Sequence, residues 1–151
     1  MNSNEERYNR YSLVKEMLET PEIVRSFDPD CTIEFADPIR RKKALFLTGE
    51  GSSRIFPAKR AISYSLKKGS SFPVTTEACT QAAEYNLEDF AVFATSNSGQ
   101  TKEVIRLALT LKNKKHEALF GLTSNHNTKL EEIANRTHIL NCGKEKAVAA
   151  T

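Results

Sequence analysis

Short, almost continuously apolar segments alternate along the chain with longer stretches in which apolar positions recur with a helical period. Apolar runs lie at residues 43–48, 89–95 and 117–123, and two weaker candidates lie at 72–76 and 137–141. Continuous apolar character, without strict alternation, is typical of parallel strands covered on both faces. The pattern therefore predicts buried strands in the first three segments and weaker strands in the other two.

Amphipathic segments occupy the intervals between these runs. Helical spacing predicts helices at 54–68, 100–113 and 128–135, and a weaker one at 78–85. In the second of these, Val104, Ala108 and Leu111 recur at i, i+4 and i+7, as on one face of a helix. Strands alternating with helices predict an α/β protein whose parallel sheet carries helices on both faces.

The first 41 residues follow a different pattern. An amphipathic helix is predicted over 5–19, and Thr20 and Pro21 predict a second helix start, with Thr20 as N-cap and Pro21 at the first helical position. A turn is expected at 28–30. We expect residues 1–41 to form a helical segment that packs on the domain, and 42–151 to form the domain itself. Since 144–151 resembles the approach to a helix and carries no stop signal, we interpret the chain as a fragment of a longer protein.

Composition and charge exclude several classes of protein. A chain of 151 residues, 39% hydrophobic and 27% charged, is long enough for one domain with its own core and is not of the disordered class. No apolar run reaches the ~18–20 residues that span a bilayer, and the N-terminus is polar, so we expect neither a membrane segment nor a secretory signal. The net charge of +3 gives no reason to expect nucleic acid. The basic runs 40–43 and 112–115 are interpreted as helix C-termini, where cations oppose the helix dipole.

The cysteines and histidines do not suggest a metal or a disulfide framework. Cys31, Cys79 and Cys142 are widely spaced and odd in number, and the histidines make no ligand spacing with them. Reduced thiols in a cytoplasmic protein without a metal are the expectation.

Hydroxyl-rich loops follow the predicted strands, where ligands bind in open α/β sheets. They cover residues 48–53, 96–101 and 123–125. The second loop is the most informative, because Ser96, Ser98 and Thr101 precede a predicted helix and Gly99 permits a close approach of the backbone. Hydroxyl donors at a helix N-terminus suit a phosphate dianion. No lysine lies in the loop, which argues against a nucleoside triphosphate. The simpler alternative is that Ser98 or Gly99 only caps the helix.

A second alternative is a dinucleotide-binding domain. Gly49 and Gly51 follow the first strand, and Glu77 stands where a ribose-binding acid could lie. The sixth position of that fingerprint is Arg54 instead of glycine or alanine, which weakens this hypothesis.

Taken together, these motifs resemble the sugar isomerase (SIS) domain of phosphosugar-binding proteins. Residues 49–53, Gly-Glu-Gly-Ser-Ser, resemble its first signature, and 96–101, Ser-Asn-Ser-Gly-Gln-Thr, match its Ser-x-Ser-Gly-x-Thr signature. Residues 143–151 and 15–21 are similar to segments of the isomerase part of glucosamine-6-phosphate synthase, whose chains carry two such domains. The similarity is to the first of the two.

The resemblance implies a three-layer α/β/α sandwich with a five-stranded parallel sheet in the flavodoxin-like order, preceded by N-terminal helices. It implies a hexose 6-phosphate ligand such as fructose 6-phosphate or glucosamine 6-phosphate, no cofactor, and a homodimer or a second SIS domain as partner. The residues it assigns to the phosphosugar are Ser52, Ser53, Ser96, Asn97, Ser98, Gly99, Thr101 and Val148.

The activity that the resemblance implies is that of one half of an aldose–ketose isomerase or an aminosugar-phosphate enzyme, with isomerase, deaminase and deglycase chemistry all left open. A non-catalytic phosphosugar sensor is the alternative. The catalytic base is unknown, since in double-domain relatives it comes from the second domain or a neighbouring chain. Glu77, Glu145 and His126 are the local candidates, and we interpret Glu77 as a helix cap and His126 as a solvated loop residue.

This sequence departs from the family pattern at three positions. Glu50 puts a carboxylate near the proposed anion site, where it would weaken binding or contact a sugar amine, and Ala150 removes a hydroxyl. If Ser53 caps the first main helix, Pro57 removes a backbone hydrogen bond early in it and would delay its start.

Overall fold

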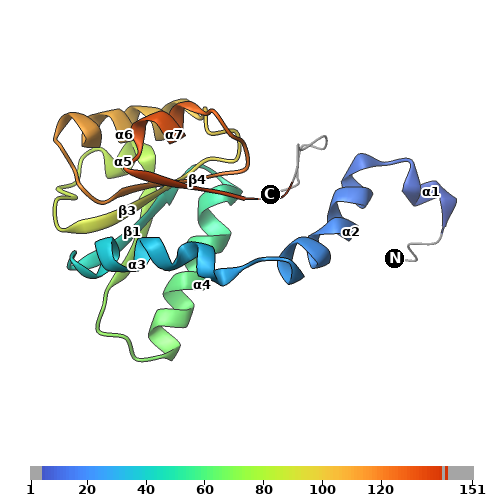
Figure 1. Cartoon of the computed structure of the whole chain (residues 1–151), viewed down its shortest axis with the longest axis horizontal. Coiled ribbons are helices and arrows are strands. Elements are labelled where there is room, and N and C mark those ends of the chain that lie inside the picture. Colours follow the sequence, from blue (N-terminus) through green and yellow to red (C-terminus); the bar gives the residue numbers. More distant parts are fainter. Residues whose placement is uncertain (1–4, 141, 143–151) are drawn as a thin grey trace.

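The computed structural model describes residues 5–140 and 142, and its centre is one parallel sheet (Figure 1). The strands are β1 (Ala44–Gly49), β2 (Val74–Ala78), β3 (Phe90–Thr95), β4 (Leu119–Thr123) and β5 (Arg136–Ile139). All pairings are parallel, in the order β2-β1-β3-β4-β5. The five strands and the flavodoxin-like order are confirmed, and the two weak candidates are the edge strands.

Helices cover both faces of this sheet. The helices of the described residues are α1 (Glu6–Asn9), α2 (Ser12–Arg25), α3 (Ile33–Arg40), α4 (Ser52–Lys67), α5 (Cys79–Ala82), α6 (Lys102–Asn113) and α7 (Lys129–Ile133), with a 3-10 helix at Pro29–Thr32. Of these, α1 and α2 extend away from the sheet (Figure 1). Figure 1 shows α5, α6 and α7 on one side of the sheet and α3 and α4 on the other. The three-layer α/β/α sandwich is therefore confirmed.

Each face has its own core. Under α6 and α7, Val92 of β3 and Leu119 of β4 are buried against Val104, Leu107 and Leu130. These apolar contacts fix the register of α6 and so the place where the helix begins.

On the opposite face, α3 closes the sheet with aromatic contacts. Phe35 meets Phe120 edge to face, with ring centroids 5.5 Å apart, and Phe93 lies 5.0 Å from Phe120. Such aromatic pairs favour this tilted geometry.

The N-terminal helices correct one sequence prediction. The region predicted as a helix over 5–19 and a new helix at Thr20 is instead α1 followed by α2, which runs through Pro21. The Thr20 hydroxyl donates to the Glu16 carbonyl within the helix, 3.1 Å away, so Thr20 is not an N-cap. Pro21 costs one backbone bond, but it is exposed, and water can solvate the Met17 carbonyl that is left without it.

The segment between α2 and the sheet holds an element that the sequence pattern does not predict. The turn at 28–30 is confirmed, because Asp28 accepts a hydrogen bond from the Asp30 amide and Pro29 opens the 3-10 helix. The unpredicted element is the helix α3 that follows. Its last residue is Arg40 and Lys112 lies in the last turn of α6, so both basic runs begin at helix C-termini as interpreted.

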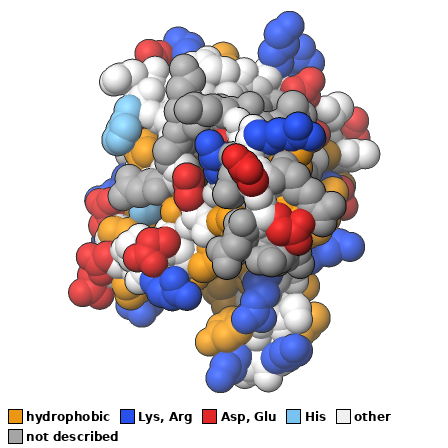
Figure 2. Space-filling model, turned by 90° about the vertical axis from the view of Figure 1, so that its right-hand side faces the viewer, with side chains coloured by type: hydrophobic (Ala, Val, Ile, Leu, Met, Phe, Trp, Pro, Cys, Tyr) orange, Lys and Arg blue, Asp and Glu red, His pale blue; other side chains and the backbone are white. Residues whose placement is uncertain are grey.

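The outer surface is mixed in character. In Figure 2 the lower end of the molecule, formed by the second half of α4, carries Lys and Arg side chains next to apolar ones. Tyr64 is exposed there, and both Arg60 and Lys68 lie 5.8 Å from its ring centroid. These cations cover the ring. No helix within the described residues is long and apolar enough to cross a membrane.

Candidate functional site

The carboxyl ends of β1 and β3 lie side by side at the point where the strand order reverses. Gly49 of β1 is paired with Thr95 of β3, while β2 lies beyond β1 and β4 beyond β3. A crevice outside the strands is expected at such a switch point. The loop after β1 and the loop after β3 therefore meet at this edge.

Three hydroxyl groups converge in the loop after β3. Ser96 is buried, and its Oγ lies 2.8 Å from Thr101 Oγ1 and 3.5 Å from Ser98 Oγ. The Thr101 amide points to Ser96 Oγ at 3.4 Å, and the Gln100 amide donates to Ser98 Oγ at 3.2 Å. This arrangement faces the N-terminus of α6, whose N-cap is Thr101. Hydroxyls and helix-end amides are the kinds of group that bind anions in proteins.

Gly99 allows the same loop to lie against α7. Its φ is +64°, and a Cβ built on it would lie 2.4 Å from Thr128 Cβ. The Gly99 carbonyl also accepts from the Leu130 amide at 3.1 Å. The close backbone approach for which Gly99 is needed is thus an approach to α7.

The loop after β4 supports the loop after β3. The Asn97 carbonyl accepts from Thr123 Oγ1 at 3.0 Å, from Asn125 Nδ2 at 2.9 Å and from the Ser124 amide at 3.1 Å. The sequence pattern indicates 123–125 only as a third hydroxyl-rich loop. Its hydroxyl and amide groups hold the candidate phosphate loop in place, a role that no local pattern indicates.

The loop after β1 leads directly into α4. Gly51 is the N-cap, with φ of +55°, and its carbonyl accepts from the amides of Arg54 and Ile55. Ser52 and Ser53 form the first turn of the helix. The expectation that Ser53 caps a late-starting helix is therefore wrong, because Gly51 supplies the turn and Pro57 is accommodated inside α4.

Glu50 has a structural partner. Its Oε1 accepts a hydrogen bond from the Cys79 amide, 3.1 Å away, at the first residue of α5. The acid that caps α5 is thus Glu50, and not Glu77 as interpreted from the sequence. Glu77 contributes its carbonyl, which accepts from Thr48 Oγ1 at 2.8 Å.

The cysteine at this edge is not a nucleophile in its resting state. Cys79 is buried, and burial raises the pKa of its thiol to about 11, with the neighbouring carboxylate of Glu50 adding to the rise. Its Sγ lies 3.3 Å from Thr48 Oγ1. A thiol protonated at neutral pH lacks the thiolate that attacks electrophiles.

The remaining candidate site residues lie away from the loop 96–101 or outside the described residues. His126 is exposed in the loop after β4. Arg54, which in the sequence serves only as an argument against a dinucleotide site, directs its Nη1 to Thr76 Oγ1 at 3.4 Å, while its buried Nε has no partner among the described residues. Val148, Glu145 and Ala150 lie outside the described residues. Among residues 5–140 and 142, no group of three or more His, Cys, Asp or Glu side chains could hold a metal ion.

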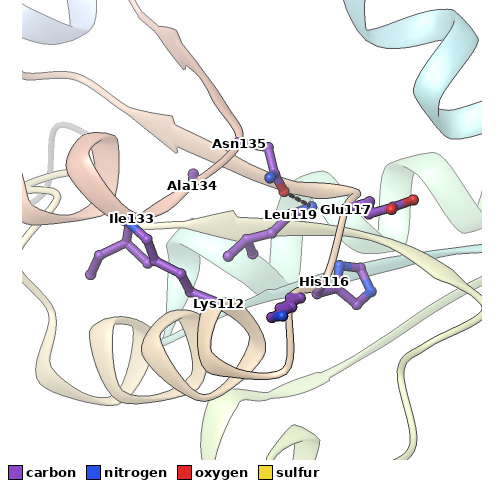
Figure 3. A pocket seen from close by; sticks show the side chains of 8 residues that line it. Lys112, His116, Glu117, Leu119, Ile133, Ala134 and Asn135 are labelled. Carbon is purple, nitrogen blue, oxygen red and sulfur yellow. Dashed lines mark hydrogen bonds between the residues drawn. The ribbon is translucent and has the colours of Figure 1, made fainter.

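A hollow lies at the opposite end of the strands, near the amino end of β4 (Figure 3). Three of its polar side chains are engaged in structural bonds. Asn135 Oδ1 accepts from the Leu119 amide at 2.8 Å, Lys112 Nζ donates to the Glu132 carbonyl at 3.0 Å, and His116 bonds the backbone at both ring nitrogens. These bonds close the corner between α6, β4 and β5.

Comparison with known proteins finds similar structures but no similar sequence family. No family profile and no curated protein matches the chain. Among solved structures, NanR of Vibrio vulnificus complexed with ManNAc-6P matches with a TM-score of 0.61 and 18% identity, over 85% of this chain and 49% of that one. The C-terminal domain of glucosamine-fructose-6-phosphate aminotransferase from Francisella tularensis matches with 0.66 and 17%, over 96% and 42%. The sugar isomerase domain of an RpiR transcription factor from Sphaerobacter thermophilus matches with 0.62 and 12%, over 85% and 72%.

These likenesses define the class of fold. The chain has the fold of the sugar isomerase (SIS) domain, as the sequence resemblance implied. It spans about half or less of the length of the NanR and aminotransferase chains that it matches.

Proposed function

We propose that this chain binds the phosphate group of a hexose 6-phosphate in the loop 96–101. The observation that carries the proposal is the convergence of Ser96, Ser98 and Thr101 hydroxyls at the N-terminus of the twelve-residue helix α6. Hydroxyl donors, helix-end amides and the dipole all favour a dianion at that point. The likeness to NanR, which was solved in complex with ManNAc-6P, supports a phosphorylated sugar as the ligand class.

The neighbouring loop would hold the sugar. Ser52 and Ser53 begin α4 at the carboxyl end of β1, on the strand paired with β3. With phosphate at 96–101, a hexose would extend toward them across the switch point, where ligands bind in open α/β sheets. Asn97 and Gly99 shape the phosphate loop, and Val148 joins the proposed site from outside the described residues.

We further propose that residues 1–41 form a helical segment and 42–151 the SIS domain. The proposed location of the protein is the cytoplasm.

The proposed role is the phosphosugar-binding half of an aldose–ketose isomerase or aminosugar-phosphate enzyme. A proton shuttle between adjacent carbons needs a base within hydrogen-bond reach. Within the described residues Glu50 already accepts from Cys79 and His126 is exposed. The base is accordingly proposed to come from a second SIS domain or a second copy. A phosphosugar-sensing regulatory domain is the second candidate, favoured by the likeness to the regulators NanR and RpiR.

Calorimetric titration of the purified chain with fructose 6-phosphate and glucosamine 6-phosphate tests the proposal. Ser98→Ala should weaken binding roughly 10- to 100-fold, since a hydrogen bond to a charged group contributes ~1.5–3 kcal/mol. Ser71→Ala, an exposed serine that precedes β2, is the matched control and should bind normally. Saturable binding of NAD in place of either sugar phosphate would favour the dinucleotide hypothesis and contradict the proposal.

A further inference from the structure

A thiol and an imidazole from distant parts of the chain meet on the α3 face of the sheet. Cys31 lies in the 3-10 helix Pro29–Thr32 and is exposed, and its Sγ lies 4.0 Å from Nδ1 of His138 in the edge strand β5. The same Sγ donates to the Asp28 carbonyl at 2.8 Å. A nucleophile within reach of a base is the usual sign of an activated thiol, and such contacts are often long before a substrate binds.

Two aromatic rings fix the orientation of this imidazole. Phe27 lies 6.0 Å from the His138 ring and Phe35 lies 6.3 Å from it, measured between ring centroids, and both meet it edge to face. The backbone of His138 is held as well, because its strand partner is Leu122 of β4. The Nδ1 atom is therefore kept beside the Cys31 thiol.

The same aromatic side chains line an apolar hollow. Its volume is about 450 Å³, and apart from Thr32 and His138 its lining is apolar, with the rings of Phe27 and Phe35 included. Hollows of this size, with apolar walls and few polar groups, are typical binding sites for small molecules. Cys31 precedes Thr32 in the chain and contacts His138, so the thiol lies at the rim of the hollow and the imidazole lies in its wall.

The charges around Cys31 favour an uncharged reagent. Asp28 and Asp30 flank the thiol in the same turn. The cation Arg136, which lies in β5 with the imidazole, is paired with Glu34 at 2.8 Å. Among the described residues, no Lys or Arg lines the hollow. Repulsion between like charges opposes an anionic reagent here, such as oxidised glutathione, whereas a neutral carbonyl compound with an apolar chain suits both the charges and the hollow.

We propose that Cys31 is a site of S-acylation, at which the thiol accepts an acyl group from a thioester and the acyl chain occupies the hollow. The Sγ atom forms a bond to the carbonyl carbon, and the bond from that carbon to the leaving sulfur breaks. His138 Nδ1 takes the proton of Cys31 and passes it to the leaving thiolate. No oxidant or further co-reactant is needed. This goes beyond the proposed function, because neither residue belongs to the loops 48–53 and 96–101.

Acylation of the full 151-residue chain by the acetyl and octanoyl thioesters of N-acetylcysteamine tests the proposal. Peptide mass spectrometry locates the adducts and follows their formation, and free N-acetylcysteine in the same mixture gives the intrinsic rates. Relative to this free thiol, Cys31 should prefer the octanoyl over the acetyl thioester roughly 10- to 100-fold, because burial of the added methylenes favours the longer chain. Cys79 is buried and should stay unmodified.

A histidine variant tests the proton transfer. His138→Gln should slow the acylation of Cys31 by both thioesters about 10-fold or more, because glutamine is polar but takes up no proton. His126→Gln, in the exposed loop after β4, is the matched control and should leave both rates unchanged. An unchanged rate in His138→Gln would contradict the assignment of the imidazole as proton acceptor.

A variant of the hollow tests where the acyl chain lies. Ala36→Leu places a larger side chain in the lining and should remove the preference for the octanoyl thioester. Labelling of the buried Cys79 would reveal an unfolded variant, and Ala36→Val, a smaller addition, then takes its place. The proposal would be overturned if Cys31 showed no chain-length preference beyond that of the free thiol, or if, relative to that thiol, it reacted faster with oxidised glutathione than with the octanoyl thioester.

Discussion

Gly99 connects the candidate phosphate loop to the helix behind it through a contact that no other residue type allows. A Cβ at this position would overlap the Thr128 side chain, which is itself buried and caps α7. Gly49 makes a comparable approach, since a Cβ there would lie 2.6 Å from the Thr95 carbonyl oxygen. At both positions the absence of a Cβ lets the backbone of the candidate site pack closely against a neighbouring segment.

Gly99→Ala is expected to lower the free energy of unfolding by roughly 2–4 kcal/mol, from strain at positive φ and displacement of Thr128. Gly51→Ala is the matched control, because φ is +55° there but a Cβ would meet nothing within 4 Å. It should cost about 1–3 kcal/mol, from the backbone alone. Urea unfolding of both variants measures the difference, and equal losses would show that the Thr128 contact is unimportant.

At the scale of elements, the two short helices α5 and α7 begin at side-chain caps. The five-residue helix α7 has a complete capping box, in which Thr128 Oγ1 accepts from the Glu131 amide and the Glu131 carboxylate accepts from the Thr128 amide. The four-residue helix α5 has no such local device, and its first amide is satisfied by Glu50 from the loop after β1. A local motif starts one helix and a tertiary contact starts the other.

Glu50→Ala is expected to cost about 1 kcal/mol of stability, as the loss of a helix cap does, whereas Glu50→Gln keeps an acceptor oxygen and should cost less. The start of α5 carries the buried Cys79, so its thiol gives a second readout. Labelling of Cys79 at neutral pH should be faster in Glu50→Ala than in the unaltered chain, with exposed Cys31 as the internal control. Unchanged labelling of Cys79 would contradict a capping role for Glu50.

At the scale of the whole molecule, the edge of the sheet opposite the candidate site is closed by His116. The Ala118 amide donates to Nδ1 at 3.3 Å, so Nδ1 accepts and Nε2 carries the proton toward the Leu87 carbonyl at 2.9 Å. The histidine is thus bonded in its neutral form between two loops. Burial is the main cause that lowers its pKa below the usual 6.5, and the charge of Lys42 acts in the same direction.

The lowered pKa of His116 predicts how the free energy of unfolding changes with pH. Because the folded pKa of His116 is lowered, the unfolded chain binds a proton more readily, and stability rises with pH between the folded and unfolded values. The contribution is therefore present above pH 6.5 and is lost as the pH falls from 6.5 toward the lowered folded pKa. His116→Gln should flatten the curve of unfolding free energy against pH in this window, and His126→Gln, in an exposed loop, should not. Identical slopes in both variants would contradict the role of His116.

Local patterns in the amino-acid sequence were enough to predict the sheet and the place of the candidate site. Strands at 43–48, 89–95 and 117–123 and the helix beginning near 100 were predictable because apolar periodicity is a local property of the chain. The hydroxyl-rich loop 96–101 was equally visible, since its residue types and spacing lie within six positions.

The features that join distant segments came only from the folded chain. They are α3 packed by Phe35 on β3 and β4, Glu50 at the start of α5, and Gly99 against Thr128. Each depends on contacts between residues far apart in sequence. The free energy of such contacts outweighs local preferences, and they produce no periodic pattern in the sequence from which they could be predicted.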